Sequence, residues 1–263
     1  MCAYQTLTDR SQLESYLRRS PDLNLYHLGD LDDFFWPHTR WFARLREGQI
    51  RALALLYSGE DPPVLLAIAH RNQEAMSALL ADLVSDLPGR VYAHLSPGLV
   101  RHFKSRYDTV HHGRHHKMTL VRPGELDFWD TSRVIPLTGS DRPRLEALYA
   151  AAYPETWFNP RMLETGTYAG IPDADGRLLS AGGVHVYSPR YRVAALGNIA
   201  TLPDQRGRGL ASLVTAGCCK RLLEQVDLIG LNVRADNAPA IRAYRKVGFE
   251  VVGNYDEWMM EGQ

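Results

Sequence analysis

Apolar residues along the chain recur with helical and strand periods in two successive runs. In the first half, the pattern predicts helices over residues 9–19, 23–46 and 71–85 and strands over 50–57, 63–69, 90–94 and 108–122. A segment with prolines and glycines follows at residues 121–137. Beyond it, the pattern predicts helices over 141–152, from the turn near 209 to about 225, and over 238–247, with strands over 178–187, 191–201, 228–233 and from 250. The similar order of elements predicts an α/β fold of the α+β, mixed-sheet kind, repeated in two domains.

Length, composition and charge agree with a globular protein. The 263 residues are near the size at which single cores divide into domains, and 45% of them are hydrophobic. Lys+Arg and Asp+Glu balance at 30 each, so no basic excess points to nucleic acid or an anionic membrane. The apolar runs, such as residues 52–57, are too short to span a bilayer. We therefore expect no nucleic-acid or membrane partner, and a monomer or a homodimer.

The three cysteines indicate a reducing compartment. Cys2, Cys218 and Cys219 cannot form a disulfide framework, because the last two are adjacent and would bridge only with severe strain. The first ten residues contain no apolar core of a signal peptide. We expect a cytoplasmic protein.

Two other clusters suggest ligands but have plainer interpretations. Residues 111–116, "HHGRHH", lack the Cys/His spacing of known zinc sites, and the central Gly-Arg pair predicts a hairpin tip with side chains on opposite faces. We expect no metal site there. The aromatic-rich residues 24–43 could line a ligand groove, but bulky apolar side chains are usually buried, so we assign them to the core of the first domain.

The clearest chemical motif is residues 203–211, "PDQRGRGLA", a turn between a predicted strand and a predicted helix. The first N–H groups of a helix lack partners inside the helix and attract anions, and glycines let a phosphate approach the backbone. Arg206 and Arg208 could add charged hydrogen bonds to the same phosphates. The motif therefore predicts an anion site, although a helix that merely begins with glycines is an alternative.

Two nucleotide-binding motifs fit this turn poorly. The Gly-Lys-Ser/Thr ending of a phosphate-binding Walker loop is absent. A dinucleotide motif would need a third small residue, where Ser212 is a poor fit, and an acidic residue where the next strand ends in Arg234. An ATP- or NAD-dependent enzyme is therefore a disfavoured alternative.

A second motif follows in residues 231–250, "LNVRADNAPAIRAYRKVGFE". Asp236 or Asn237 is placed to cap a helix, and Gly248 stands just past its end. Asn237 and Tyr244 are seven residues apart, so they share one helix face. Taken singly, Asn237 could be only a helix cap, and Tyr244 could be only a half-buried aromatic residue.

Together the two motifs resemble those of the GNAT superfamily of acyl-CoA N-acyltransferases, most closely over residues 193–252. Asn237 and Tyr244 fall on the cofactor-binding asparagine and the catalytic tyrosine of that family. The residues that match its pyrophosphate loop are Arg206, Gly207, Arg208, Gly209, Leu210 and Ala211. The layout looks like the tandem FR47-like proteins, which implies a degenerate GNAT-like domain over 1–125 without the loop and an acyl-CoA-binding catalytic domain over 133–263.

The resemblance also implies a mechanism that uses acetyl-CoA. The strand at Ile199, Ala200 and Thr201 would pair with the pantetheine arm, and Ser212 would lie in the first turn of the cofactor helix. Tyr244, whose ordinary pKa of about 10 compares with about 8.5 for a thiol, would protonate the departing thiolate.

The family pattern does not identify the general base that would take a proton from the acceptor amine. Asn232 stands where many members have a glutamate, and Asn198 stands on the preceding strand. An amide is no base at neutral pH. A water chain to His185, Glu155 or Glu164 could replace it, as could an amine that arrives deprotonated.

Residues 153–170 are expected to form the acceptor site. Trp157, Phe158 and Tyr168 lie there among prolines and glycines, and Glu155 and Glu164 favour a cationic amine. Alternatively, these aromatics join the two domains. The resulting hypothesis is an N-acetyltransferase for an amine of a small molecule or peptide, with a non-catalytic acyl-CoA sensor as the alternative from another class.

Overall fold

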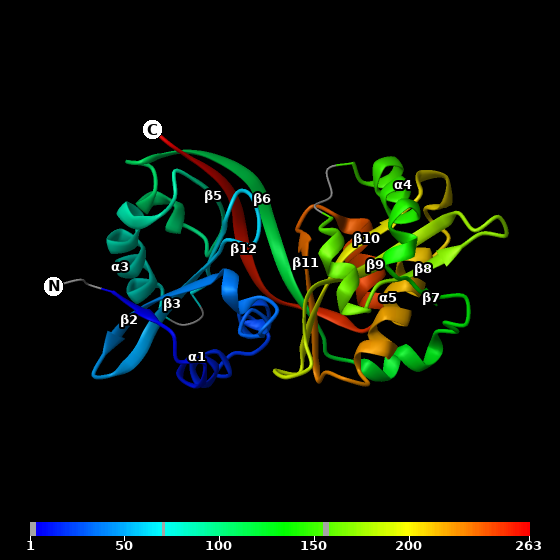
Figure 1. The fold of residues 1–263 in the computed structure, drawn as a ribbon, viewed down its shortest axis with the longest axis horizontal. Coiled ribbons are helices and arrows are strands. Elements are labelled where there is room, and N and C mark those ends of the chain that lie inside the picture. Colours follow the sequence, from blue (N-terminus) through cyan, green and yellow to red (C-terminus); the bar gives the residue numbers. More distant parts are fainter. Residues whose placement is uncertain (1–3, 70–71, 155–157) are drawn as a thin grey trace. The chain divides into compact units, whose positions relative to one another are not determined.

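A computed structural model describes residues 4–69, 72–154 and 158–263 (Figure 1). The chain forms two compact units. Unit 1 comprises Met1–Lys117, Arg234–Asp236 and Val252–Gln263, and unit 2 comprises Met118–Val233 and Asn237–Val251. No helix among these described stretches is long and apolar enough to cross a membrane.

Unit 1 is built on a mixed sheet in which β1, β2, β3, β4, β5 and β12 are neighbours in that order. Its helices are α1 (Arg10–Leu17), α2 (Leu25–Gly29) and α3 (Gln73–Leu83). Its strands are β1 (Gln5–Leu7), β2 (Thr39–Arg46), β3 (Gln49–Tyr57), β4 (Val64–Ala67), β5 (Arg90–Leu95), most of β6 (Tyr107–Leu120) and most of β12 (Phe249–Gly262). Met76, Leu79, Leu80 and Leu83 of α3 pack with Val91, Ala93 and Leu95 of β5 in the apolar core.

In unit 2, the strands β11, β10, β9, β8 and β7 are neighbours in that order, with β10 and β11 parallel and β9 antiparallel to β10. Its helices are α4 (Arg142–Ala152), α5 (Leu210–Leu222) and α6 (Ala238–Lys246). Its strands are β7 (Ile135–Pro136), β8 (Ala169–Pro172), β9 (Leu178–Ser188), β10 (Val193–Thr201) and β11 (Leu228–Arg234). Helices α4 and α5 both pack on β9 and β10 (Figure 1). The mixed α/β fold expected from the sequence is confirmed.

The unit boundaries pass through three strands: β6, β12 and, at its last residue Arg234, β11. β6 contains residues of both units, and so does β12, because residues 252–263 group with the N-terminal residues. The functional division into a domain over 1–125 without the loop and an acyl-CoA-binding domain over 133–263 stays a prediction.

The helix predicted over 23–46 is wrong for most of its length. Only α2, Leu25–Gly29, and a short 3-10 turn at Trp36–His38 are helical, and Thr39–Arg46 is a strand. Glu47 and Gly48, with φ of 55° and 72°, form the turn that pairs β2 with β3. Two successive residues with positive φ suit a tight hairpin, and strand pairing then overrides helical periodicity.

The hairpin predicted at residues 111–116 is also wrong. These residues lie inside the 14-residue strand β6, where Gly113 has φ of 109° without reversing the chain. Their imidazoles meet other side chains instead: the His111 ring lies 4.4 Å from the Trp258 ring, and the His112 ring 5.5 Å from that of Tyr92. Within the described ranges, no group of three or more His, Cys, Asp or Glu side chains could hold a metal ion.

Replacing Gly248 with alanine should destabilise unit 2. Gly248 follows α6 with φ of 105°, and a Cβ there would lie 2.3 Å from the carbonyl oxygen of Arg122. The backbone conformation alone costs about 1–2 kcal/mol for an L-residue, and the contact adds to it. Gly139→Ala is the control, because its Cβ would meet nothing within 4 Å. Equal free energies of unfolding for the two variants in urea would contradict this explanation.

Candidate active site

Strands β10 and β11 run side by side for only part of their length. They pair in parallel from Val193 with Leu228 to Leu196 with Leu231. β10 nevertheless continues to Thr201, and β11 to Arg234. The edge of β10 that faces β11 is therefore left without a strand partner over residues 197–201. An unpaired strand edge presents backbone N–H and C=O groups to any extended chain that lies against it.

A bulge in β10 coincides with this separation. Gly197 pairs with Gly183 of β9 and Ala200 pairs with Ala181, so Asn198 and Ile199 together face the single residue Gly182. Asn198 has φ of 54°, a left-handed conformation that is uncommon for residues other than glycine. Such an extra residue bends a strand and increases its twist.

Two buried tyrosines hold Asn198 in this conformation. The Tyr149 hydroxyl of α4 donates to the Asn198 carbonyl at 3.0 Å, and the Asn198 amide nitrogen donates to the Tyr168 hydroxyl at 3.1 Å. Burial raises the pKa of Tyr149 well above its usual value and that of Tyr168 to about 12, so both hydroxyls stay protonated at neutral pH. We call these three residues the bulge clamp.

The glycine turn follows β10 directly and opens α5. Gly207 and Gly209 have φ of 80° and 79°, and a Cβ on either would meet nothing within 4 Å. Gly209 is the N-cap of α5 and offers no side chain to its first N–H groups, and the first turn contains no acidic residue. By contrast, Asp9, Asn72 and Asn237 cap their helices through side-chain oxygens. The first N–H groups of α5 thus have no side-chain cap, and an anion bound to them stays a prediction.

The two arginines of the turn differ. The guanidinium of Arg206 donates to the Ala152 carbonyl at 2.9 Å and to the Thr201 carbonyl at 3.4 Å, which ties the turn to α4 and β10. Arg208 is exposed. Phosphate contacts by either side chain stay a prediction, and the geometry favours Arg208 because Arg206 already has two protein acceptors.

Helix α6 carries the other two predicted cofactor residues. The Asn237 Oδ1 accepts from the Ala240 backbone N–H at 3.2 Å, so Asn237 caps the helix. Tyr244 is 8% exposed, and burial raises the pKa of its hydroxyl. That hydroxyl makes no hydrogen bond to a residue that the structure describes. Ser212, predicted as a cofactor residue, donates to the Ala243 carbonyl at 3.1 Å and so joins α5 to α6.

The candidate bases lie in different surroundings. His185 is the extra residue of β9 at the point where the pairing register between β9 and β10 shifts. Its ring occupies the space beside Gly197, where a Cβ on residue 197 would lie 2.0 Å from the imidazole. Glu164 is exposed, and Glu155 lies outside the described residues. Asn232 has a buried Oδ1 without a hydrogen-bond partner among the described residues.

The predicted acceptor segment is only partly a loop. Tyr168 is fully buried, and its ring fills the space over Gly183. Phe158 packs between Tyr149 and Tyr168, with ring centroids 5.1 and 5.7 Å away. Trp157 lies outside the described residues. Phe158 and Tyr168 thus support the bulge clamp, while their contact with an acceptor stays a prediction.

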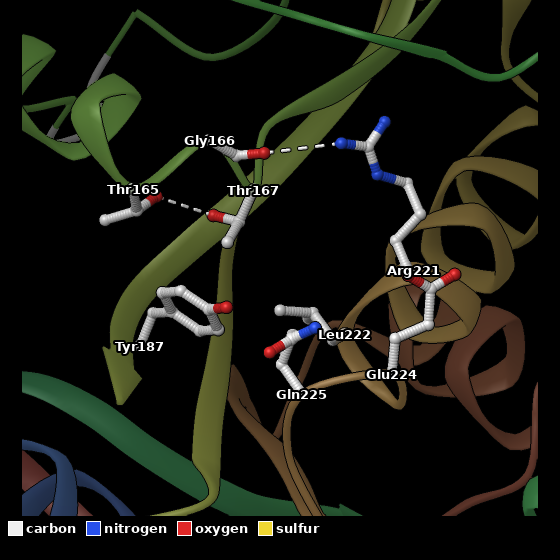
Figure 2. A pocket seen from close by; sticks show the side chains of 8 residues that line it. All are labelled: Thr165, Gly166, Thr167, Tyr187, Arg221, Leu222, Glu224 and Gln225. Atoms are coloured by element: carbon white, nitrogen blue, oxygen red, sulfur yellow. Dashed lines mark hydrogen bonds between the residues drawn. The ribbon is translucent and has the colours of Figure 1, made fainter. Parts of the chain in front are cut away.

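A pocket of about 360 Å³ lies elsewhere in unit 2 (Figure 2). The Tyr187 hydroxyl and the Gln225 amide point into it, and Arg221 donates across it to the Gly166 carbonyl at 3.3 Å. Arg221 and Leu222 belong to the last turn of α5, whereas the glycine turn precedes the first. The pocket is therefore about 20 Å from the turn, given a rise of about 1.5 Å per residue, and is separate from the predicted site.

The bulge clamp does not follow from the sequence motifs, which assign no role to Tyr149 and none as a base to Asn198. The signal in the sequence is the cluster of small residues, Gly182 and Gly183 on β9 and Gly197 on β10, which leaves room for rings. Which rings fill that room depends on how α4 packs on the sheet.

Substitutions at Asn198 test the clamp. Asn198→Ala loses the hydrogen bond to Tyr168 and keeps the positive φ, so the free energy of unfolding should fall by about 1–3 kcal/mol. Asn198→Gly loses the same bond but accepts this φ, and should be more stable than the alanine variant by about 1 kcal/mol. Urea unfolding measures both. An alanine variant as stable as the glycine variant would show that the bulge is not strained.

Comparisons with known proteins give partial matches. The model of the family described as FR47-like protein matches residues 187–259. The mycothiol acetyltransferase of Tsukamurella paurometabola is 31% identical over 128 residues, 48% of this chain and 39% of that protein. The mycothiol acetyltransferase of Corynebacterium jeikeium is 50% identical over 50 residues, 19% of this chain and 14% of that protein. The matches thus span less than half the length of these relatives.

Solved structures share the fold at low sequence identity. A Drosophila protein superposes with a TM-score of 0.73 at 13% identity over 99% of both chains. A tandem GNAT protein from the clavulanic acid biosynthesis pathway does so with a TM-score of 0.56 at 15% identity over 98% of both chains. A GNAT-family protein from Novosphingobium aromaticivorans has a TM-score of 0.52 at 23% identity over 70% of this chain and 80% of its own. The FR47-like match is thus confined to residues 187–259, and the solved structures show that the chain shares the fold of GNAT-family proteins.

Proposed function

We propose that this protein transfers an acetyl group from acetyl-CoA to an amine of a small molecule or peptide. The observation that carries the proposal is the continuity of two binding elements. The unpaired edge of β10, residues 197–201, leads within the same unit to the uncapped N-terminus of α5. The relatives named as acetyltransferases support acetyl transfer, and the amine is our own inference.

The glycine turn fits the pyrophosphate of coenzyme A. A diphosphate needs several donors and a positive potential, which the free N–H groups and the dipole of the 13-residue helix α5 supply. The space beside Gly207 and Gly209 is open, so phosphate oxygens could approach the backbone. Arg208 could add a charged contact.

The edge of β10 fits the pantetheine arm. That arm carries amide groups, and an unpaired strand edge binds amides through backbone hydrogen bonds. Ile199, Ala200 and Thr201 supply this edge, while their other edge pairs with β9 through Ala200 with Ala181 and Thr201 with Ser180. When bound, acetyl-CoA supplies an acyl group activated as a thioester.

Two groups of the chain have suitable chemistry for the transfer. The backbone N–H groups at the bulge could donate to the acyl oxygen as negative charge develops on it, and they need no reorganisation because the bulge clamp fixes them. The Tyr244 hydroxyl is kept protonated by burial, so it could donate a proton to the departing thiolate sulfur.

No carboxylate replaces the amide of Asn232 on β11. Its buried, unpartnered Oδ1 can accept a hydrogen bond from an amine N–H but cannot take the proton at neutral pH. We therefore expect an acceptor amine that loses its proton to water, with activity rising with pH towards the pKa of that amine.

The absence of a carboxylate at Asn232 also favours a second candidate function, that of a non-catalytic acyl-CoA sensor. In that case the amides of Asn198 and Asn232 would reflect lost chemistry, and coenzyme A thioesters would bind without turnover. The two candidates share a binding site and differ in the release of free thiol.

Acetyl-CoA should raise the melting temperature saturably, because a ligand that binds only the folded state stabilises it. Gly209→Ala should weaken this binding at least about tenfold by placing a methyl group where the diphosphate approaches. Gly176→Ala is the matched control, since Gly176 also has positive φ, 84°, and open space. Equal shifts in both variants, or a larger wild-type shift with NAD or ATP, would refute the assignment.

Tyr244→Phe should lower turnover by about 10²-fold or more while the acetyl-CoA melting shift is retained, because proton donation by one side chain typically contributes that much. The measurement is thiol release over a panel of amines and peptides at several pH values. Undiminished turnover in the variant would exclude Tyr244 as the acid. Binding without thiol release from any amine in the wild type would favour the sensor.

A further inference from the structure

The pocket of about 360 Å³ at the C-terminal end of α5 has no part in the proposed function (Figure 2). Its walls come from the last turn of α5 with the residues that follow it, from Tyr187 of β9, and from residues 165–167. Leu222, which is 3% exposed, adds an apolar wall. All of these residues belong to unit 2. Ligand sites have volumes of about 300–1,000 Å³, so this pocket suits a small molecule.

Arg221 lies on one side of the pocket and keeps most of its hydrogen-bonding capacity. One N–H of its guanidinium donates to the Gly166 carbonyl at 3.3 Å, and this bond draws the side chain across the pocket (Figure 2). A guanidinium has five N–H donors, and the others have no acceptor among the described residues. Arg221 therefore offers an anion a charged donor whose position is held by Gly166.

Glu224 carries the opposite charge and stands three residues further along the chain. Opposite charges at this spacing often pair on a helix, but Arg221 and Glu224 do not, and the Glu224 carboxylate bonds to no residue that the structure describes. Glu224 follows the last turn of α5, where the helix dipole is also negative. This part of the pocket therefore favours a positive group.

Three neutral polar groups line the same space. The Tyr187 hydroxyl and the Gln225 amide point into it and make no hydrogen bond to a described residue (Figure 2). Burial raises the pKa of Tyr187, so its hydroxyl stays protonated at neutral pH. Thr165 donates to the Met162 carbonyl at 2.7 Å, so the proton between the Thr165 and Thr167 hydroxyls, 2.7 Å apart, comes from Thr167. The Thr167 oxygen, in a residue only 8% exposed, is then left as an acceptor.

From this cavity we infer that unit 2 binds a small zwitterion, a free α-amino acid, at a site separate from the proposed acetyl-CoA site. The carboxylate of the ligand would accept from the Arg221 guanidinium and the Tyr187 hydroxyl. Its ammonium would donate to the Glu224 carboxylate at the negative end of α5. The Gln225 amide, which both donates and accepts, could bond to either end.

The charges of the lining favour a zwitterion over a simple ion. Among the residues that line the pocket, only Arg221 and Glu224 are charged, and their charges cancel. A lone carboxylate would pair with Arg221 but be repelled by Glu224, and a lone amine would be in the converse position. A zwitterion pairs with both. A further charge on the ligand side chain would find no partner in the lining, so we expect neutral amino acids to bind best.

The affinity should be modest. Arg221, Glu224 and Gln225 are exposed, and water competes for exposed ion pairs, each of which contributes little. We expect a dissociation constant of roughly 1 mM.

The experiment is a thermal-shift and calorimetric titration of the full chain, without acetyl-CoA, against neutral L-amino acids up to about 20 mM, well above the expected constant. Propionate, which lacks the amine of alanine, and ethylamine, which lacks its carboxylate, are the half-ligands, and sodium chloride is the blank for ionic strength. Aspartate and lysine test the effect of a further charge. We expect at least one neutral amino acid to raise the melting temperature saturably, the half-ligands to act as the blank does, and aspartate and lysine to bind more weakly.

Two variants of unchanged size test the assignment to these residues. Glu224→Gln should weaken binding about fivefold, and Tyr187→Phe, which removes only the hydroxyl, about threefold. The double variant should lose more than about tenfold, because the two bonds are made to opposite ends of the ligand. Asp175→Asn changes an exposed carboxylate of unit 2 outside the pocket and should bind as the wild type does. Urea unfolding confirms that each variant is folded, and if one is not, the other single variant decides.

Each outcome is decisive. Saturable binding that weakens in the pocket variants and not in Asp175→Asn supports the site. Stabilisation that does not saturate, or none with any amino acid, would overturn it. Propionate or ethylamine binding as strongly as alanine would overturn the zwitterion, and unchanged affinity in the double variant would overturn the assignment to this pocket. The inference does not rest on acetyl transfer, and an acetyl-CoA titration of the same preparation reports on that proposal separately.

Discussion

The separation of β10 from β11 beyond Leu196 and Leu231 is the constraint on which the rest of the candidate site depends. Two strands that stay paired use the backbone groups of their facing edges on each other, so no extended ligand could lie between them. The bulge at Asn198 inserts one residue into β10 and redirects the strand at this point. The conformation is strained for an asparagine, and the hydrogen bonds of Tyr149 and Tyr168 offset that strain.

The glycine turn resembles the edge of β10 in that both leave backbone groups without a partner. β10 leaves its backbone unpaired on one edge, and α5 leaves its first N–H groups without a side-chain cap. Arg206 ties the turn to β10 and α4 by donating to the carbonyls of Thr201 and Ala152. A residue that the motif suggests as a phosphate ligand thus has a structural task, because it fixes the turn on which the donors are carried.

The sequence by itself determined the features that are encoded locally. Gly209 at the start of α5, Asn237 and Gly248 at the two ends of α6, and the order of most elements followed from short motifs and periodicity. The tertiary structure alone decided that 39–46 pairs as a strand, that 111–116 continues one, and that Tyr149 and Tyr168 hold Asn198. The physical reason is that such contacts join segments far apart in the chain, and local propensity carries no information about which segments will meet.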